Sequence, residues 1–258
     1  MSVDHTQCTV RQVADVFELE QALKLVHDSY VDRGYMSAHP SELRLCIQDA
    51  LPQTRTFVAQ LQGRIIATVS LFFDSTFGLP LDSLYRDELD TLRHQGRRIG
   101  EVGMLADRRR ALLRSLPLVL RLMKLVFWSA REKSLDDLII ATHPRHANFY
   151  QRLLCFEQFA EIKYYSAVRN APAVPMRLDL AGLDPAQVQG RIRELFFSSL
   201  TADALGAEPY RIDAEGLRYL FVERTDMLKQ LSPFQRRELQ KLHCGVDIDA
   251  LATATRND

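Results

Sequence analysis

The chain has 258 residues, and 47% of them are hydrophobic, so it can bury a sizeable core and global disorder is not expected. Its 33 lysines and arginines balance 33 aspartates and glutamates, which argues against a bulk attraction to nucleic acid or to an anionic membrane. The four cysteines lie far apart without a CxxC motif, a pattern that favours reduced cytoplasmic thiols over disulfides or a zinc site.

The first part of the chain is predicted to form a strand, a helix and a hairpin. Thr9 to Val13 is typical of a short strand, and Phe17 to Arg33 carries apolar residues three and four positions apart, as in an amphipathic helix. The segments Thr56 to Leu61 and Ile65 to Phe73 are strand-like. Gln62-Gly63 between them indicates a tight hairpin turn.

The middle of the chain contains its most apolar stretch. A loop over 74–82, a helix over 83–94, a strand over 99–106 and a long helix over 111–133 are expected in this order. Within the last helix, residues 112–128 carry Arg114, Arg121 and Lys124, so this is predicted to be a core helix without stable membrane insertion. The N-terminal residues MSVDHTQC lack the layout of a signal peptide, and we expect a cytoplasmic protein.

Residues 136–156, DDLIIATHPRHANFYQRLLCF, combine a short apolar run with a basic, aromatic helical stretch. The break at His143-Pro144 places imidazole, guanidinium and phenol groups at the C-terminal end of a buried strand, where ligands bind in open α/β sheets. Strands over Phe159 to Val168 and Met176 to Leu180 are expected to complete the sheet.

The pattern changes near residue 181. Asp184-Pro185 and Ser232-Pro233 each look like a helix cap followed by proline at the first helical position, and Gln235 can reach back to complete the second cap. We therefore predict an α/β (α+β) fold, with a mixed central sheet flanked by helices over 1–180 and a helical C-terminal extension over 181–258.

This order of elements is similar to the GNAT acyltransferase fold. The chain more narrowly resembles the FeeM-type N-acyl amino acid synthases, which are related to the acyl-homoserine lactone synthases. The segments that carry the resemblance are YVDRGY (30–35), ATVSLFFDSTFGLPLDSLYRDEL (67–89), GRRIGEVGMLA (96–106) and IIATHPRHANFYQRLLCFE (140–157).

The resemblance implies an N-acyltransferase. Such an enzyme moves a long-chain fatty acyl group from acyl carrier protein to the α-amino group of an amino acid. No bound cofactor is expected, since the thioester on 4'-phosphopantetheine arrives as a co-substrate. The partners would be acyl carrier protein and the amino acid acceptor, with no nucleic acid and no metal.

The sequence departs from its relatives at two places. Ordinary GNAT enzymes hold the pyrophosphate of coenzyme A with a glycine-rich loop at a helix N-terminus, whereas residues 105–110 are LADRRR and contain no glycine. A loop of arginines suits the single phosphodiester of carrier protein. Cys155 stands where the family usually has glycine.

The resemblance supplies three catalytic candidates. Glu101 is placed as the base that takes a proton from the amine, although a strand-end glutamate is also common in any sequence. Tyr150 is placed as the donor of a proton to the departing thiolate, although an aromatic at helical spacing is more often a core residue. His143 could act as acid or base, or could simply cap the helix. For His146 the structural interpretation is favoured, and HPRH lacks the spacing of a metal site.

The expected donor-binding residues surround the loop after the central strand. They are Gly103, Leu105, Arg108, Arg109, Arg110 and Arg145. Gly103 would let the strand bulge and aim backbone N–H groups at the thioester oxygen, or it is a packing glycine. The arginines would meet the phosphate and the acidic surface of carrier protein, or they belong to an ordinary solvated loop.

Arg33 and Tyr35 are the expected acceptor-binding residues, with Arg33 on the acceptor carboxylate. A cation that simply suits a helix C-terminus is an equally good interpretation of Arg33. The apolar residues Phe72, Phe73, Phe77 and Leu79 could line an acyl tunnel, but core positions are their default.

Three other functions remain open from the sequence. The nearest enzymatic alternatives are acyl-homoserine lactone synthesis and N-acylation of ornithine in lipid formation. The third is a non-catalytic scaffold of the same fold that binds a partner through its helical tail.

Overall fold

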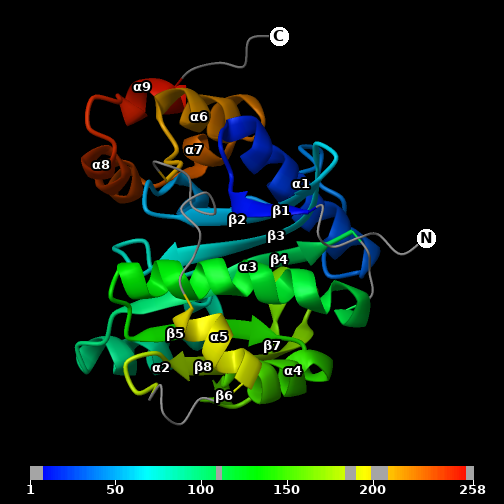
Figure 1. Ribbon diagram of the computed structural model, residues 1–258. Helices are drawn as coiled ribbons and strands as arrows, with labels where there is room; N and C mark the ends of the chain where they lie inside the picture. The colour runs from blue at the N-terminus through cyan, green and yellow to red at the C-terminus, as the bar shows by residue number, and fades with distance from the viewer. Residues whose placement is uncertain (1–7, 109–111, 184–189, 199–208, 254–258) are drawn as a thin grey trace.

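The computed structural model describes residues 8–108, 112–183, 190–198 and 209–253, and a mixed β-sheet runs through the centre of this part of the chain (Figure 1). Its eight strands are ordered β1-β2-β3-β4-β5-β8-β6, and β7 also pairs with β8. The pair β4–β5 is parallel, and the other pairs are antiparallel. The strands are β1 Thr9–Gln12, β2 Arg55–Leu61, β3 Arg64–Phe73, β4 Ile99–Asp107, β5 Asp137–Thr142, β6 Glu157–Gln158, β7 Lys163–Tyr165 and β8 Ala171–Asp179.

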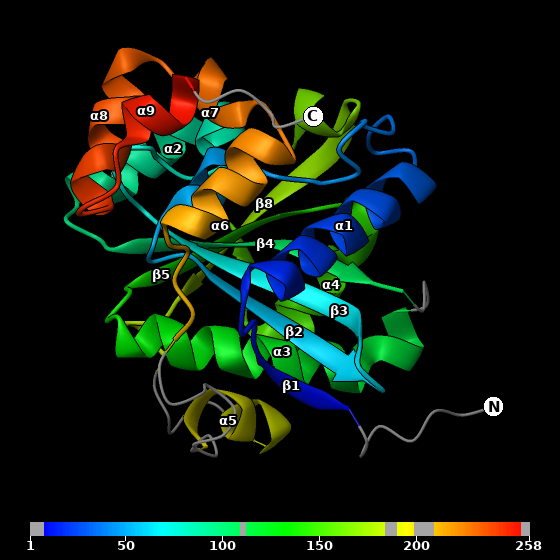
Figure 2. The same cartoon turned by 90° about the horizontal axis from the view of Figure 1, so that it is seen from above.

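Helices cover both faces of the sheet. The helix α3 lies along one face with α5, while α1 and the C-terminal helices lie on the other (Figure 2). The α-helices are α1 Val16–Asp32, α2 Asp82–His94, α3 Leu112–Glu132, α4 Pro144–Leu154, α5 Gly190–Phe197, α6 Ala214–Arg218, α7 Met227–Gln230, α8 Pro233–Leu242 and α9 Ile248–Thr253. Short helices η2 (Ile47–Ala50), η3 (Ser166–Val168) and η5 (Tyr219–Glu223) lie between them.

The predicted order of strands and helices up to α4 is confirmed. The predicted hairpin turn joins β2 to β3, and both Gln62 (φ +50°) and Gly63 (φ +75°) have positive φ. Two consecutive positive φ values are the signature of the type I′ turn, whose twist matches that of the flanking strands. The long helix is α3, which buries Leu118, Leu122 and Val126 against the sheet.

The prediction of one strand over residues 159–168 is wrong. Two short strands, β6 and β7, are followed by the turn η3. The N–H of Phe159 still bonds to Pro175, but Lys163 already pairs with Ala173, so residues 160–162 leave the ladder. The Tyr85 hydroxyl holds this excursion, since it accepts the Lys163 N–H at 2.9 Å and lies 2.9 Å from the Glu161 carbonyl oxygen. A tertiary contact of this kind leaves no local trace in the sequence.

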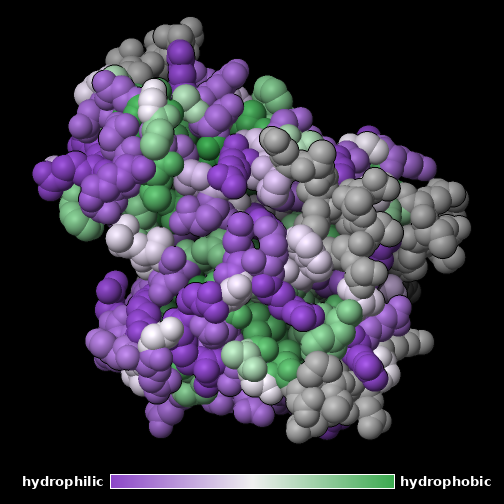
Figure 3. Space-filling view, turned by 60° about the vertical axis from the view of Figure 1, so that its left-hand side comes forward, coloured by the Kyte–Doolittle hydropathy of each residue, from purple (hydrophilic) through white to green (hydrophobic). Residues whose placement is uncertain are grey.

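The C-terminal helices share the hydrophobic core of the α1 face. Leu217, Leu220 and Phe221 are fully buried in the same cluster as Leu23 of α1. Their outer surface is mostly hydrophilic, as the upper part of Figure 3 shows. The division of the chain into two parts at residue 181 stays a prediction. The hydrophobic cluster contains residues from both sides of this boundary.

One of the two predicted C-terminal caps can be examined. At the start of α8, the N–H of Gln235 donates to the Ser232 hydroxyl at 3.2 Å, and the Gln235 side chain accepts the Ser232 N–H at 3.0 Å. The predicted capping box is therefore confirmed. The other predicted cap, Asp184-Pro185, lies outside the described residues. None of the helices in the described ranges is long and apolar enough to cross a membrane.

Candidate active site

A cavity of about 850 Å³ opens where the two central parallel strands separate. The strands β4 and β5 pair only from Ile99 to Glu101 on one side and from Asp137 to Ile139 on the other. Beyond these residues both strands continue without pairing to each other, and the cavity lies between their ends. Residues of α1, α3, α4 and the β7–β8 hairpin close its other sides.

A bulge interrupts β4 at the edge of this cavity. Ser70 pairs with Gly103 and Thr68 with Ala106, so Met104 and Leu105 together face a single residue of β3. Met104 has φ +53°, a left-handed conformation that is strained for a residue with a side chain. The bulge predicted beside Gly103 is present. The packing interpretation of Gly103 also has support, because a Cβ there would lie 3.0 Å from the Phe72 ring.

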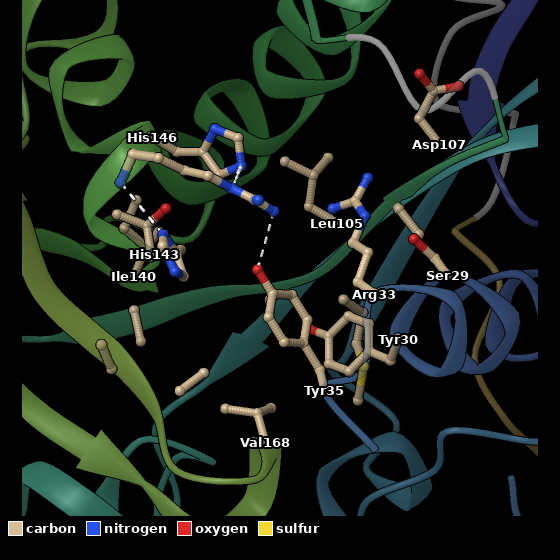
Figure 4. A pocket seen from close by; sticks show the side chains of 18 of the residues that line it. Ser29, Tyr30, Arg33, Tyr35, Leu105, Asp107, Ile140, His143, His146 and Val168 are labelled. Atoms are coloured by element: carbon tan, nitrogen blue, oxygen red, sulfur yellow. Dashed lines mark hydrogen bonds between the residues drawn. The ribbon is translucent and has the colours of Figure 1, made fainter. Parts of the chain in front are cut away.

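Cationic and phenolic side chains gather at one side of the cavity (Figure 4). The Arg145 guanidinium donates to the Tyr35 hydroxyl at 3.0 Å and to Nε2 of His146 at 3.0 Å. The Tyr35 ring stacks on His143, with 6.5 Å between ring centroids. Arg33 reaches the same space from the end of α1, and its guanidinium makes no hydrogen bond or ion pair with the side chain or backbone of another described residue. Arg33 is therefore available to bind an anion.

The environment of the two histidines at the start of α4 favours their neutral forms. His143 is the N-cap of α4, and its Nδ1 accepts the N–H of Arg145 at 3.3 Å. Burial and the Arg145 charge lower the pKa of His143. Burial, followed by Arg145 and Arg33, lowers the pKa of His146 to about 4. No group of three His, Cys, Asp or Glu side chains in the described part of the chain is arranged to hold a metal ion.

Glu101 does not itself line the cavity, but its side chain lies next to Gly103, which does. Its side chain is only 7% exposed, and its Oε2 accepts the Leu81 N–H at 2.8 Å. Burial, with a smaller effect from the Asp82 charge, raises the pKa of Glu101 to about 8. Its Oε1 is 3.9 Å from where a Cβ of Gly103 would stand, and Gly103 itself lines the cavity. A carboxyl group with a raised pKa thus lies beside a residue of the cavity lining.

Tyr150 lines the cavity from α4 and is 8% exposed. Burial and the neighbouring Tyr30 raise the pKa of Tyr150 above its ordinary value of 10. Its phenol therefore keeps its proton throughout the neutral range and can act only as a donor there.

The remaining predicted residues fall into three groups. Leu105 and Arg108 line the cavity, and the Arg108 Nε donates to the Ile65 carbonyl at 3.1 Å. Arg109 and Arg110 lie outside the described residues. The four residues considered for an acyl tunnel do not line the cavity, and three of them are buried in the hydrophobic clusters, which favours the core interpretation: Phe72, Phe73, Phe77 and Leu79.

Tyr165 is a cavity residue that sequence reasoning missed. Its hydroxyl donates to the Pro80 carbonyl at 3.3 Å and accepts from the Ser83 hydroxyl at 3.1 Å. The charge of Glu101 raises the pKa of Tyr165, after the larger effect of burial. A tyrosine in a short irregular strand carries no sequence pattern that distinguishes it from a packing residue.

A splayed parallel strand pair, a bulged central strand and a cavity with a basic mouth define an acyltransferase site of the GNAT fold. The model of the FeeM family, "N-acyl amino acid synthase FeeM", matches residues 21–179. The chain belongs to this family and is an N-acyltransferase.

Solved structures agree with this assignment. The chain is similar to FeeM, an N-acyl amino acid synthase from uncultured soil microbes, with 28% identity, a TM-score of 0.59, and 68% of this chain and 91% of that chain covered. The acyl-homoserine lactone synthase LasI shares the fold at 15% identity and a TM-score of 0.53, over 79% of this chain and 98% of that one. The CoA-dependent lactone synthase BjaI does so at 15% identity and a TM-score of 0.53, over 80% and 95%. No curated protein matches the chain in sequence.

Proposed function

We propose that this enzyme moves a long-chain fatty acyl group from the thioester of acyl carrier protein to the α-amino group of an amino acid. The observation that carries the proposal is the cavity between β4 and β5, which joins apolar walls to a mouth that carries arginines. The walls include Val102, Leu105, Val119, Ile140 and Phe149, and the mouth includes Arg33, Arg108 and Arg145; Asp28, Asp32 and Asp107 also line the cavity.

The mouth suits a donor with one phosphate. Residues 105–108 contain no glycine, so side chains stand where a GNAT enzyme would bring its backbone against a diphosphate. Arg108 and Arg145 can instead form charge-assisted hydrogen bonds to the phosphodiester of 4'-phosphopantetheine. The acidic surface of carrier protein would meet the same cations from outside. These features support carrier protein over coenzyme A as the donor.

The end of α1 suits the carboxylate of the acceptor. Arg33 is exposed to the cavity, and Tyr35 is held beside it by the bond from Arg145. A guanidinium can bind a carboxylate through two parallel N–H donors, which would also orient the α-amino group. We propose that Arg33 and Tyr35 bind the acceptor.

The chemistry requires a neutral amine, donors for the tetrahedral oxyanion and a proton for the leaving thiolate. Glu101, with its raised pKa, would take the amine proton near neutral pH by way of a bridging water, because its carboxyl group lies beside the cavity-lining Gly103. His143, a neutral imidazole in the cavity, is the second candidate for this proton. Backbone N–H groups at the Met104 bulge would bind the oxyanion, and Tyr150 would protonate the thiolate.

The decisive experiment offers the purified protein acylated carrier protein with the common amino acids and identifies products by mass spectrometry. An N-acyl amino acid is expected, and Glu101→Gln should reduce its formation. Parallel reactions with acyl-CoA, with S-adenosylmethionine and with ornithine test the other donor and the other acceptors. A lactone as the sole product would reassign the enzyme to the lactone synthases. Tight carrier-protein binding without turnover would support the scaffold.

A further inference from the structure

One arginine outside the cavity, Arg93, forms ion pairs with three carboxylates, and one of these carboxylates, Asp82, lies near the buried Glu101. Arg93, in the last turn of α2, donates through Nε and Nη2 to Asp74 at 2.7 and 2.9 Å. It also donates through Nη1 and Nη2 to Asp82, at 2.7 and 2.6 Å. A bond from Nη1 to Asp90 at 2.6 Å completes the cluster. No described residue of this cluster lines the cavity.

The cluster fixes the turn that holds Glu101. Asp82 accepts the Leu79 N–H at 2.6 Å, so Arg93 and this bond together lock the turn at residues 79–82. Within the turn, the peptide group between Pro80 and Leu81 makes a hydrogen bond on each side. Its N–H donates to Glu101, and its carbonyl accepts from the cavity-lining Tyr165. The Glu101 carboxyl group is therefore held by a hydrogen bond from a turn that Arg93 anchors.

Few charged groups surround Glu101. From the neighbouring strands its register partners are apolar, Phe72 on β3 and Ile139 on β5. Asp82 on α2 and Tyr165 on β7 are the described titratable groups that interact with it. Asp82 is only 7% exposed, and its counter-charges are Arg93, in direct contact, and Arg86. Without Arg93, Glu101 would face an anion with little solvent screening.

We propose that Arg93 is a positioning residue that sets the pH range of acyl transfer, by neutralising Asp82 and by anchoring the turn that binds Glu101. This inference rests on the proposed function, because it needs Glu101 to be the base. It predicts that catalysis responds to a charge that touches neither substrate nor Glu101.

The test is the pH profile of kcat/KM for acyl transfer from carrier protein. Arg93→Met is expected to move the acid limb to higher pH by about one unit, which is roughly a tenfold loss of rate on that limb. Asp82→Asn alone should move the limb the other way, because it removes the anion and leaves Arg93 with two carboxylates. The double variant should return towards the wild-type profile.

Arg55→Met is the matched control. Arg55 is a buried arginine that bonds Ser129 at 3.0 Å and Glu132 at 2.6 Å on α3, on the other face of the sheet. Its loss should lower stability without moving the limb. An unmoved limb in Asp82→Asn and in Arg93→Met would overturn the proposal, as would an equal movement in Arg55→Met. If Arg93→Met does not fold, Asp82→Asn decides alone. Absence of turnover in the wild type would instead contradict the proposed function.

Discussion

The Glu101 carboxyl group illustrates how burial changes the chemistry of a side chain. Its one hydrogen bond, from the Leu81 N–H, favours the charged form, and its pKa is nevertheless raised from 4.5 to about 8. Desolvation is thus the larger effect. A general base is most effective when its pKa lies near the working pH, and this environment brings Glu101 into that range.

The same burial makes stability depend on pH. Between pH 4.5 and about 8 the folded protein keeps a proton on Glu101 that the unfolded chain releases, so stability falls as pH rises through this window. The loss is on the order of a few kcal/mol. We expect the melting temperature to fall from pH 6.5 to 8.5, a range above the titrations of Asp49 and His146. Glu101→Gln should flatten this fall, and an equally steep fall in the variant would contradict the assignment.

Tyr150 offers a test of the proton donor. Tyr150→Phe removes only the hydroxyl and keeps the ring contacts with Phe149 and Phe156. We expect kcat to fall by about 10²-fold with little change in KM. Tyr164→Phe, at a residue that is 70% exposed, is the matched control and should leave kcat unchanged. Steady-state kinetics would measure both, and an undiminished kcat in Tyr150→Phe would exclude the role.

The sequence reveals some of these residues and conceals others for a physical reason. His143 directly follows the buried strand β5, and Tyr150 lies on the helix after it, so strand and helix periodicity place both near the end of the strand. Glu101 lies in β4, which is also a buried strand that its apolar residues predict. Tyr165 and Asp82 come to the site through turns fixed by tertiary hydrogen bonds, and local patterns do not encode such bonds.

At the scale of elements, α4 is defined by its two ends. His143 caps its start with Pro144 in the first helical position, and Cys155 at its end has φ +57°. Glycine is the residue that best tolerates this left-handed conformation, which explains why the family usually has glycine there. Cys155 is therefore a conformational departure, and it does not line the cavity.

The two arginines of α4 allow a matched test of donor binding. Arg145 lines the cavity and Arg152 does not. Arg145→Met should raise KM for the acylated carrier protein by about 10- to 100-fold, the effect of losing a charge-assisted hydrogen bond. Arg152→Met should change KM little. Equal effects of the two substitutions on KM would indicate a general loss of positive charge and not a site.

At the scale of the molecule, the C-terminal helices belong to the hydrophobic core of the α1 face. Tyr219 donates to Glu20 of α1 at 2.8 Å, and His243 lies 2.7 Å from the Ala50 carbonyl oxygen. These contacts join residues nearly two hundred positions apart. The match to the family model ends at residue 179, so the C-terminal helices lie outside the matched region although they pack against it.

A pair of phenylalanines tests this packing. Phe221→Ala empties a fully buried site and should cost about 3–5 kcal/mol of unfolding free energy. Phe234→Ala, at a residue that is 56% exposed, should change stability by no more than about 0.5 kcal/mol. Urea unfolding of both variants measures the difference. A small loss for Phe221→Ala, or a separate transition for the C-terminal helices, would contradict a shared core.

The order of elements could be predicted from the sequence, because the hydrophobic periodicity of long elements is strong. The family is indicated by the resemblance of four segments between residues 30 and 157. The extent of the cavity could not be predicted. It depends on where the pairing of β4 with β5 stops, at Glu101 and Ile139, and on the bulge at Met104. A bulge beside Gly103 could be predicted from the glycine. The point where the pairing stops is set by how the strands twist against each other, and the residue types in either strand do not specify it.

The separation of β4 from β5 has a consequence for what the enzyme recognises. Past Glu101 and Ile139, the peptide groups of each strand that point towards the other lack a ladder partner there. Backbone N–H and C=O groups that are shielded from water need hydrogen-bond partners. The pantetheine arm of the proposed donor is an extended chain with amide bonds of its own, so it would complete the sheet as an added strand. The arm would then be bound by main-chain atoms of the strands. Substitutions of the surrounding side chains could therefore change the preferred acyl length without abolishing donor binding.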